Sequence, residues 1–144
     1  AWVLAGVLFA WQMPHFLALA WYHREDYARG GFRMLPQVDP RGALTGGATL
    51  LASLVLLPVC AALYRVGAGG PIFLAAGLGL SGGLAWASWR LLALRTAPAA
   101  RRLFLASLVY LPLLLGVLVA DPTGAAPTSA SRTVADAAAA TPRR

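Results

Sequence analysis

The sequence predicts an all-α fold, a polytopic bundle of helices that crosses a membrane several times. Hydrophobic residues make up 59% of the 144 residues and charged residues only 12%, whereas soluble domains carry roughly 45–50% apolar and about 25% charged residues. Four intervals contain no Asp, Glu, Lys or Arg: residues 1–22, 42–64, 66–89 and 103–120. A helix needs about 20 predominantly apolar residues to cross the hydrocarbon core. We therefore expect four transmembrane helices and no sheet.

The four spans are expected at about residues 1–21, 44–64, 71–91 and 101–120. Pro71 and Pro98 suit helix starts, where a missing N–H costs nothing. The stretch GLGLSGG in the third span supplies small residues for close helix contact; a passage for a cofactor is the alternative. The single cysteine, Cys60, can form no internal disulfide and is expected to be a packing residue.

Arginine accounts for all 12 basic residues, and the net charge is +7. Four arginines lie in the first loop, four between the third and fourth spans, and only Arg65 borders the second loop. The positive-inside rule then places the first and third loops in the cytosol or its organellar equivalent. This topology explains the basic residues more simply than nucleic-acid binding does, so no nucleic-acid partner is expected.

Residues 1–120 are expected to form one membrane domain. From residue 121 to 144 the composition changes to Ala, Thr, Ser and Pro without an apolar period, which predicts a disordered tail. The chain opens on Ala1, already inside a span, so we expect a fragment or a mature piece of a longer protein.

A histidine lies inside the first apolar interval, where an ionisable group is costly and usually faces the bundle interior. Trp11 and Tyr22 fall on the same helical face as His15. Pro14 is expected to bend the helix and free a carbonyl group nearby. His15 is either a neutral side chain hydrogen-bonded within the bundle or a ligand or proton-transfer group.

Five charged residues crowd together just beyond this span: Arg24, Glu25, Asp26, Arg29 and Arg33. If the helix continues to Asp26, that residue shares a face with His15, about 16 Å further along the axis. Mg²⁺ prefers one or two carboxylates plus substrate phosphates, and arginine forks hold phosphate oxygens. The cluster fits a diphosphate site; an ordinary interfacial loop, with its acids paired to Arg, is the alternative.

The stretch WQMPHFLALAWYHREDYARGGFRMLP resembles the second signature region of the haem O synthases (protoheme IX farnesyltransferases), a branch of the UbiA-type intramembrane prenyltransferases. The matching residues are Trp11, Gln12, Pro14, His15, Phe16, Asp26, Tyr27, Gly31 and Met34. ARRLFLASLVYLPLLL is similar to the last helix of that family, so the resemblance covers about residues 1–120. The forms WQMPHF and REDYARGG look more like the mitochondrial branch than like bacterial members.

The resemblance implies a fold of about nine membrane helices, four of them present here. It also implies transfer of a farnesyl group from farnesyl diphosphate to a vinyl group of haem B, which gives haem O for haem A and the terminal oxidases. In this family two acidic motifs hold Mg²⁺ and the diphosphate. Farnesyl diphosphate, haem B, the lipid bilayer and haem A synthase are the expected partners.

The resemblance also gives roles to individual residues. Asp26 and Glu25 would hold the metal, and the catalytic group would comprise Arg24, Glu25, Asp26 and Tyr27. The diphosphate would be bound by Arg24, Arg29, Arg101 and Arg102. The haem would be bound by His15, a candidate axial ligand, with Trp11 and Gln12.

Two departures from the family pattern stand out. The first acidic motif, of the type Asn-Asp-x-x-x-Asp, is absent, so we expect this chain to be the C-terminal half and inactive alone. The second motif has only Glu25 and Asp26 as acids, so metal binding is expected to rest mostly on the absent half.

Two other functions stay open. The acceptor could be an aromatic ring instead of haem, or the chain could be a non-catalytic haem-binding membrane subunit. For the location we expect the mitochondrial inner membrane, with the bacterial plasma membrane as the alternative.

Overall fold

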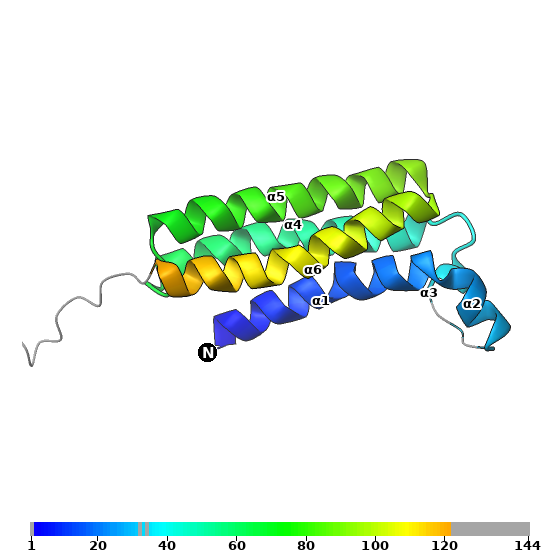
Figure 1. The fold of residues 1–144 in the computed structure, drawn as a ribbon, viewed down its shortest axis with the longest axis horizontal. Coiled ribbons are helices and arrows are strands. Elements are labelled where there is room, and N and C mark those ends of the chain that lie inside the picture. Colours follow the sequence, from blue (N-terminus) through cyan, green and yellow to red (C-terminus); the bar gives the residue numbers. More distant parts are fainter. Residues whose placement is uncertain (1, 32, 34, 122–144) are drawn as a thin grey trace, which may run out of the picture.

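The computed structural model describes residues 2–31, 33 and 35–121, and within these ranges it confirms the all-α fold and contains no strand. Four long helices run side by side: α1 (Trp2–Tyr22), α4 (Ala43–Arg65), α5 (Pro71–Leu94) and α6 (Ala97–Ala120) (Figure 1). Two short helices, α2 (Arg24–Arg29) and α3 (Leu35–Val38), connect α1 to α4 at one end. Residues 122–144, nearly all of the predicted tail, lie outside the described ranges.

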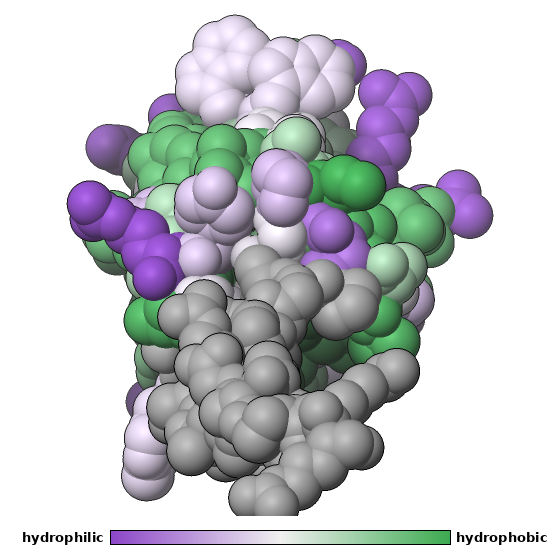
Figure 2. Space-filling model, turned by 90° about the vertical axis from the view of Figure 1, so that its left-hand side faces the viewer, coloured by the Kyte–Doolittle hydropathy of each residue, from purple (hydrophilic) through white to green (hydrophobic). Residues whose placement is uncertain are grey.

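All four long helices are long and apolar enough to cross a membrane. α5 continues past residue 91 to Leu94, and α6 already begins at Ala97 with Pro98 in its first turn. Viewed along the bundle from the end where α5 begins, apolar residues cover much of its flanks (Figure 2). Exposed apolar flanks suit contact with lipid, since the hydrocarbon core offers no hydrogen bonds. The chain is therefore a multi-pass membrane protein.

The long helices form a closed ring, because each packs against two others. α1 contacts α4 and α6, and α5 contacts the same two helices. The ring encloses a core of fully buried side chains: Leu56, Cys60, Phe73, Leu103 and Leu114 among others. Cys60 thus occupies the packing position expected of it.

Glycines allow two close helix contacts. A Cβ atom on Gly46 of α4 would lie only 2.7 Å from the Cα atom of Leu92 on α5. A Cβ atom on Gly77 of α5 would lie 3.2 Å from Sγ of Cys60. The predicted small-residue contact is therefore confirmed for Gly77 alone, since the space around the other glycines of GLGLSGG is open: Gly79, Gly82 and Gly83.

Hydroxyl groups join neighbouring helices inside the bundle. Ser53 on α4 lies 2.8 Å from Ser88 on α5, oxygen to oxygen. Ser81 on α5 lies 3.0 Å from the hydroxyl of Tyr110 on α6. Such interhelical hydrogen bonds contribute on average about 0.6 kcal/mol in membrane proteins. They favour one rotational setting of each helix over its alternatives.

Two aspartates cap helix starts at opposite ends of the bundle. Oδ2 of Asp39 accepts a hydrogen bond of 2.8 Å from the backbone N–H of Thr45 in the first turn of α4. Oδ2 of Asp121 accepts one of 2.8 Å from the N–H of Phe73 in α5, and its carbonyl accepts one of 3.1 Å from Gly70. Asp121 therefore joins the end of α6 to the start of α5.

The arginines of the first and third loops lie at the same end of the bundle, because α2, α3 and the α5–α6 connection all lie there (Figure 1). Arg65 ends α4 at the opposite end. This arrangement is the one that the positive-inside rule requires.

The first span does not continue as one helix to Asp26, contrary to the expectation from the sequence. α1 ends at Tyr22, His23 has φ −100° and ψ 19°, and α2 then turns away from the bundle (Figure 1). The turn places Glu25, Asp26 and Arg29, which are all exposed, at the end of the bundle. The prediction that His15 and Asp26 share one face of a continuous helix is therefore wrong.

Candidate active site

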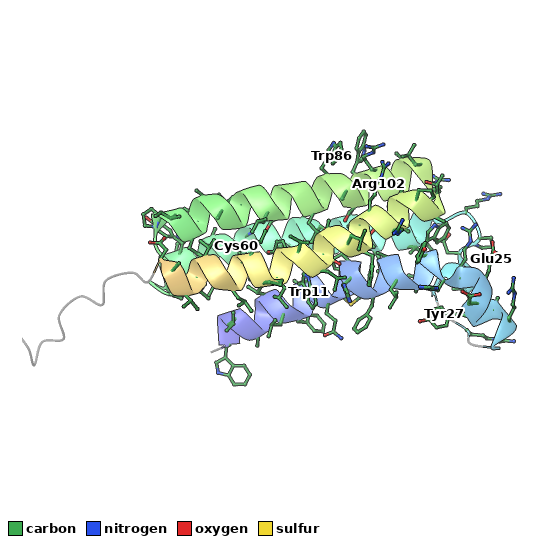
Figure 3. All side chains as sticks on the ribbon, viewed as in Figure 1. Trp11, Glu25, Tyr27, Cys60, Trp86 and Arg102 are labelled. Carbon is green, nitrogen blue, oxygen red and sulfur yellow. The ribbon has the colours of Figure 1, made fainter. Side chains whose placement is uncertain are left out.

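The first group of predicted site residues lies in the contact between α1 and α6. Nε1 of Trp11 donates a hydrogen bond of 2.7 Å to the carbonyl oxygen of Ser107. Nδ1 of His15 lies 2.9 Å from the hydroxyl oxygen of the same serine. Because Trp11 and His15 are one helical turn apart, a single residue of α6 holds both. Figure 3 shows Trp11 on the stretch of α1 that runs beneath α6.

The ring of His15 makes stacking contacts with two aromatic rings. Its centroid lies 4.9 Å from that of Trp11, with 20° between the planes, and 5.0 Å from that of Phe104, with 28°. His15 is half-buried, and its Nε2 atom makes no hydrogen bond to any described residue. Gln12, also predicted to contact haem, is exposed and does not join this cluster.

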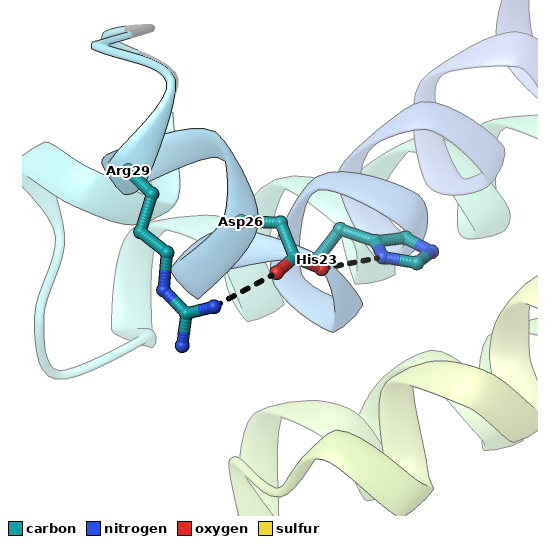
Figure 4. Close-up of polar contacts among 3 residues, drawn as sticks. All are labelled: His23, Asp26 and Arg29. Carbon is teal, nitrogen blue, oxygen red and sulfur yellow. Dashed lines mark hydrogen bonds and ion pairs between the residues drawn. The ribbon is translucent and has the colours of Figure 1, made fainter.

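The second group of predicted residues lies on α2. Oδ2 of Asp26 lies 3.3 Å from Nδ1 of His23, and its Oδ1 lies 3.8 Å from a guanidinium nitrogen of Arg29 (Figure 4). The side chains of Asp26 and Arg29 are 69% and 79% exposed, so this ion pair contributes little and exchanges readily with solvent. Glu25 is exposed and has no ion pair within the described part of the chain.

Arg24 lies against the end of α1, with its guanidinium carbon 4.6 Å from the ring centroid of Trp21. Trp21 is only 3% exposed, and its ring covers Gly42, whose φ of +68° is a left-handed conformation that favours glycine. This contact fixes α1 against the start of α4. A guanidinium stacked on an aromatic face still presents its N–H donors to an anion.

The arginines of the third loop lie apart from α2. Arg101 and Arg102 are exposed in the first turns of α6. Arg102 lines a cavity of about 170 Å³ between α5 and α6, together with Arg90 and Trp86. In Figure 3, Trp86 and Arg102 lie over the α5–α6 hairpin, away from Glu25 and Tyr27 on α2. The structure places these arginines at the predicted end of the bundle but not around Asp26.

The donor set on α2 suits a hard cation that is only partly held by protein. Within the described ranges, no three His, Cys, Asp or Glu side chains come together to hold a metal. Asp26 and Glu25 are adjacent and exposed, and offer at most two carboxylates. That number suits Mg²⁺, which keeps several waters and takes further oxygens from phosphates.

Sequence reasoning missed three residues that contact the predicted site. His23 bonds to Asp26, Phe104 covers His15, and Ser107 binds both Trp11 and His15. The only signal for Ser107 was its polarity within an otherwise apolar span, since such hydroxyls usually face a neighbouring helix.

The chain is similar to known prenyltransferases along most of its length. The sequence profile of the UbiA prenyltransferase family matches residues 1–127. A protein from Solibacter usitatus named protoheme IX farnesyltransferase is 37% identical over 124 residues, which are 86% of this chain and 42% of that protein. No solved structure matches the chain.

Proteins of the same name from two further bacteria are equally similar. The one from Koribacter versatilis is 39% identical over 127 residues, 83% of this chain and 41% of that protein. The one from Bordetella pertussis is 41% identical over 121 residues, 84% of this chain and 40% of that protein. The chain thus spans about two fifths of the length of the curated relatives it matches.

Proposed function

The chain belongs to the UbiA prenyltransferase family, and on that premise we propose that it takes part in transferring a farnesyl group from farnesyl diphosphate to a vinyl group of haem B. The product would be haem O, which leads to haem A and the terminal oxidases. The similarity to proteins named protoheme IX farnesyltransferase carries this proposal, since it covers 83–86% of the chain. The chain spans about two fifths of those relatives, so we propose the activity for the full-length protein.

The contact between α1 and α6 supports the choice of haem as acceptor. His15 keeps Nε2 free of hydrogen bonds to described residues and stacks with Trp11 and Phe104. A half-buried imidazole surrounded by aromatic rings is a suitable neighbour for a flat, apolar porphyrin. We assign His15 and Trp11 to the haem-binding part of the site. Gln12 is exposed on the same helix and would contact haem from the edge of that site.

Helix α2 supports the choice of a diphosphate as donor. Asp26 and Glu25 would hold Mg²⁺ through their carboxylate oxygens, and the cation would supply charge neutralisation for the diphosphate. Arg24 and Arg29 would bind phosphate oxygens through their forked N–H groups. For Arg29 this requires only the exchange of an exposed ion pair. Tyr27 completes the proposed catalytic group on this helix.

The reaction needs positive charge at the end of the bundle and exclusion of water deeper in the membrane. When the allylic C–O bond breaks, its electron pair leaves with the diphosphate, and the arginine-rich end of the bundle stabilises that charge electrostatically. Arg101 and Arg102 add positive potential at the same end. The carbocation left behind would be protected from water by the apolar helices until the vinyl group of haem B attacks it. That attack forms the new C–C bond and leaves a cation on the carbon next to the porphyrin ring, which would then take up a water molecule and release a proton to leave a hydroxyl group.

Substitution of Asp26 tests the diphosphate role. In the full-length protein, expressed in cells that lack their own haem O synthase, we expect Asp26→Asn to lower haem O by about 100-fold, the effect of removing one key electrostatic group. Haem O is measured by extraction and mass spectrometry at matched protein levels. Arg65→Gln, at the opposite end of the bundle, is the control and should retain full activity. Undiminished haem O from Asp26→Asn would contradict the assignment.

The same assay separates the two alternative functions. An enzyme with an aromatic acceptor would consume labelled farnesyl diphosphate when given that acceptor and ignore haem B. A non-catalytic haem-binding subunit, which the surroundings of His15 alone would also suit, would bind haem and make no haem O. Only a haem B farnesyltransferase requires both His15 and Asp26 for the same product.

The proposed location is a membrane, since the chain has four helices that can span one. The relatives described above come from bacteria, so they give no support to the mitochondrial inner membrane expected from the form of the motifs. We propose a bacterial plasma membrane or that mitochondrial membrane as the site of action, with haem A synthase as the partner that would take up haem O.

A further inference from the structure

Ser107 of α6 makes hydrogen bonds to two residues of α1 and, through its hydroxyl, to one residue of its own helix. Its carbonyl oxygen accepts the indole N–H of Trp11 at 2.7 Å. Its hydroxyl oxygen lies 2.7 Å from the carbonyl oxygen of Phe104, one turn earlier on α6. The same hydroxyl oxygen lies 2.9 Å from Nδ1 of His15 on α1. The direction of each bond follows from counting protons.

The hydroxyl proton is used by Phe104. A carbonyl oxygen can only accept, so the hydroxyl of Ser107 must donate in that contact. A hydroxyl has one proton and two lone pairs, which leaves its oxygen as an acceptor toward His15. For both contacts to be hydrogen bonds at once, Nδ1 of His15 has to carry a proton and donate it to Ser107.

The second ring nitrogen follows from the first. A neutral imidazole carries one N–H, so protonated Nδ1 leaves a lone pair on Nε2. The rings of Trp11 and Phe104 stack on the imidazole at centroid distances of 4.9 and 5.0 Å. Metal-binding histidines commonly donate their other N–H to a fixed acceptor, which sets the tautomer and the ring orientation.

We propose that Ser107 is a positioning residue: its hydroxyl holds His15 in the Nδ1–H tautomer and so presents the Nε2 lone pair as the atom that binds haem iron. The tautomer follows from hydrogen bonds within the chain. The identity of the ligand atom rests on the proposed function, in which His15 faces haem B.

The tautomer is measured without haem. The full-length protein is prepared in lipid nanodiscs with ¹⁵N-labelled histidine rings, at about pH 8.5, where an imidazole of ordinary pKa is neutral. The variant His15→Gln identifies the His15 signals in the spectrum. We expect the wild type to show ¹⁵N shifts of a protonated Nδ1 and an unprotonated Nε2. An Nε2–H tautomer in the wild type would overturn the proposal, whatever the protein does with haem.

Two substitutions test the part played by Ser107. Ser107→Thr keeps the hydroxyl and is expected to keep the Nδ1–H tautomer. Ser107→Ala removes the acceptor and is expected to lose much of the Nδ1–H signal. If Ser107→Ala keeps the wild-type spectrum, Ser107 does not set the tautomer and the proposal fails.

Haem titration tests the ligand atom separately. Ferric haem is added to the same nanodiscs and its absorption band is followed. We expect affinity to fall by about 10-fold or more in Ser107→Ala, as for other residues that orient a metal ligand, and to recover in Ser107→Thr. If His15→Gln binds haem as tightly as the wild type, the iron-ligand role fails along with that part of the proposed function, while the NMR result still decides the tautomer.

Discussion

At the scale of single residues, two aspartates in one loop have opposite surroundings. Asp26 is 69% exposed, and its carboxylate pairs with His23 and Arg29, at the start and end of its own short helix. Asp39 is 6% exposed and accepts a backbone hydrogen bond in the first turn of α4. A carboxylate already bonded to backbone N–H groups is poorly placed to bind a metal as well. Of the two aspartates, Asp26 has the carboxylate that is open to solvent, as its proposed role requires, and Asp39 is a structural residue.

Asp39 makes the folding stability of the protein depend on pH. Burial raises the pKa of its carboxyl, but hydrogen bonds from the backbone of Thr45, Leu44 and Ala43 lower the pKa by more than burial raises it. The pKa of Asp39 therefore lies below its ordinary value. A group whose pKa is depressed by folding contributes stability above its unfolded pKa, about 3.9, and loses it as the pH falls toward the folded pKa. We expect the unfolding temperature in detergent to fall below about pH 4, and to fall less in Asp39→Asn. An equal fall in both proteins would contradict this assignment.

Some contacts of single residues could be predicted from the sequence and others could not. The pairing of Trp11 with His15 on one face was predictable, because one helical turn separates them. Their contact with Ser107 was not predictable, because it depends on how α1 and α6 are rotated against each other. In the sequence, Ser107 is 92 residues away from His15. Gln12 shows the same difficulty: its motif suggested a haem contact, yet it is exposed on α1.

At the scale of helices, length and hydropathy predicted the four spans but not the break at His23. A span can be recognised by counting apolar residues, since the bilayer sets the required length. The helix break at His23 accompanies tertiary contacts that a local sequence pattern cannot predict. Trp21 packs over Gly42 at the start of α4, and this fixes the end of α1 while the charged residues turn away. The end of α1 is thus held in place by a contact across the first loop.

The contact between α4 and α5 should be sensitive to one methyl group. We expect Gly46→Ala to destabilise the bundle by about 1–3 kcal/mol, since its Cβ would meet the backbone of Leu92 at 2.7 Å and overpacking costs that much. The adjacent Gly47 has open space around its Cα atom, so Gly47→Ala is the matched control. It should be neutral or stabilising by up to about 1 kcal/mol, the helix propensity of alanine over glycine. Resistance to unfolding in detergent measures both, and equal stability of the two variants would refute the close contact.

At the scale of the whole molecule, charge and connectivity agree on one orientation. The first and third loops hold the arginine clusters and lie at one end of the ring, while the α4–α5 connection lies at the other (Figure 1). Composition was sufficient to predict this, because the number of spans fixes which loops share a side. The closure of the ring through α1 and α6 needed the structure.

Orientation can be checked with cysteines introduced into the loops. The background is Cys60→Ala, which removes the buried native thiol. We expect Ala28→Cys and Thr96→Cys to react with a membrane-impermeant maleimide from the cytosolic side, and Ala68→Cys to react only from the other side. All three positions are exposed in the structure. Labelling of Ala28→Cys and Thr96→Cys from opposite sides would exclude the four-span arrangement.

The bond between His15 and Ser107 has a consequence for biosynthesis. Of the four long helices, α1 leaves the ribosome first and α6 last, so the polar groups of α1 wait in the translocon or the lipid until the fourth helix arrives. During that interval Trp11 and His15 lack the acceptors that Ser107 later supplies. Unfinished chains would thus display unpaired polar groups within the bilayer, the kind of feature by which membrane chaperones and quality-control proteases distinguish an incomplete protein from a finished one.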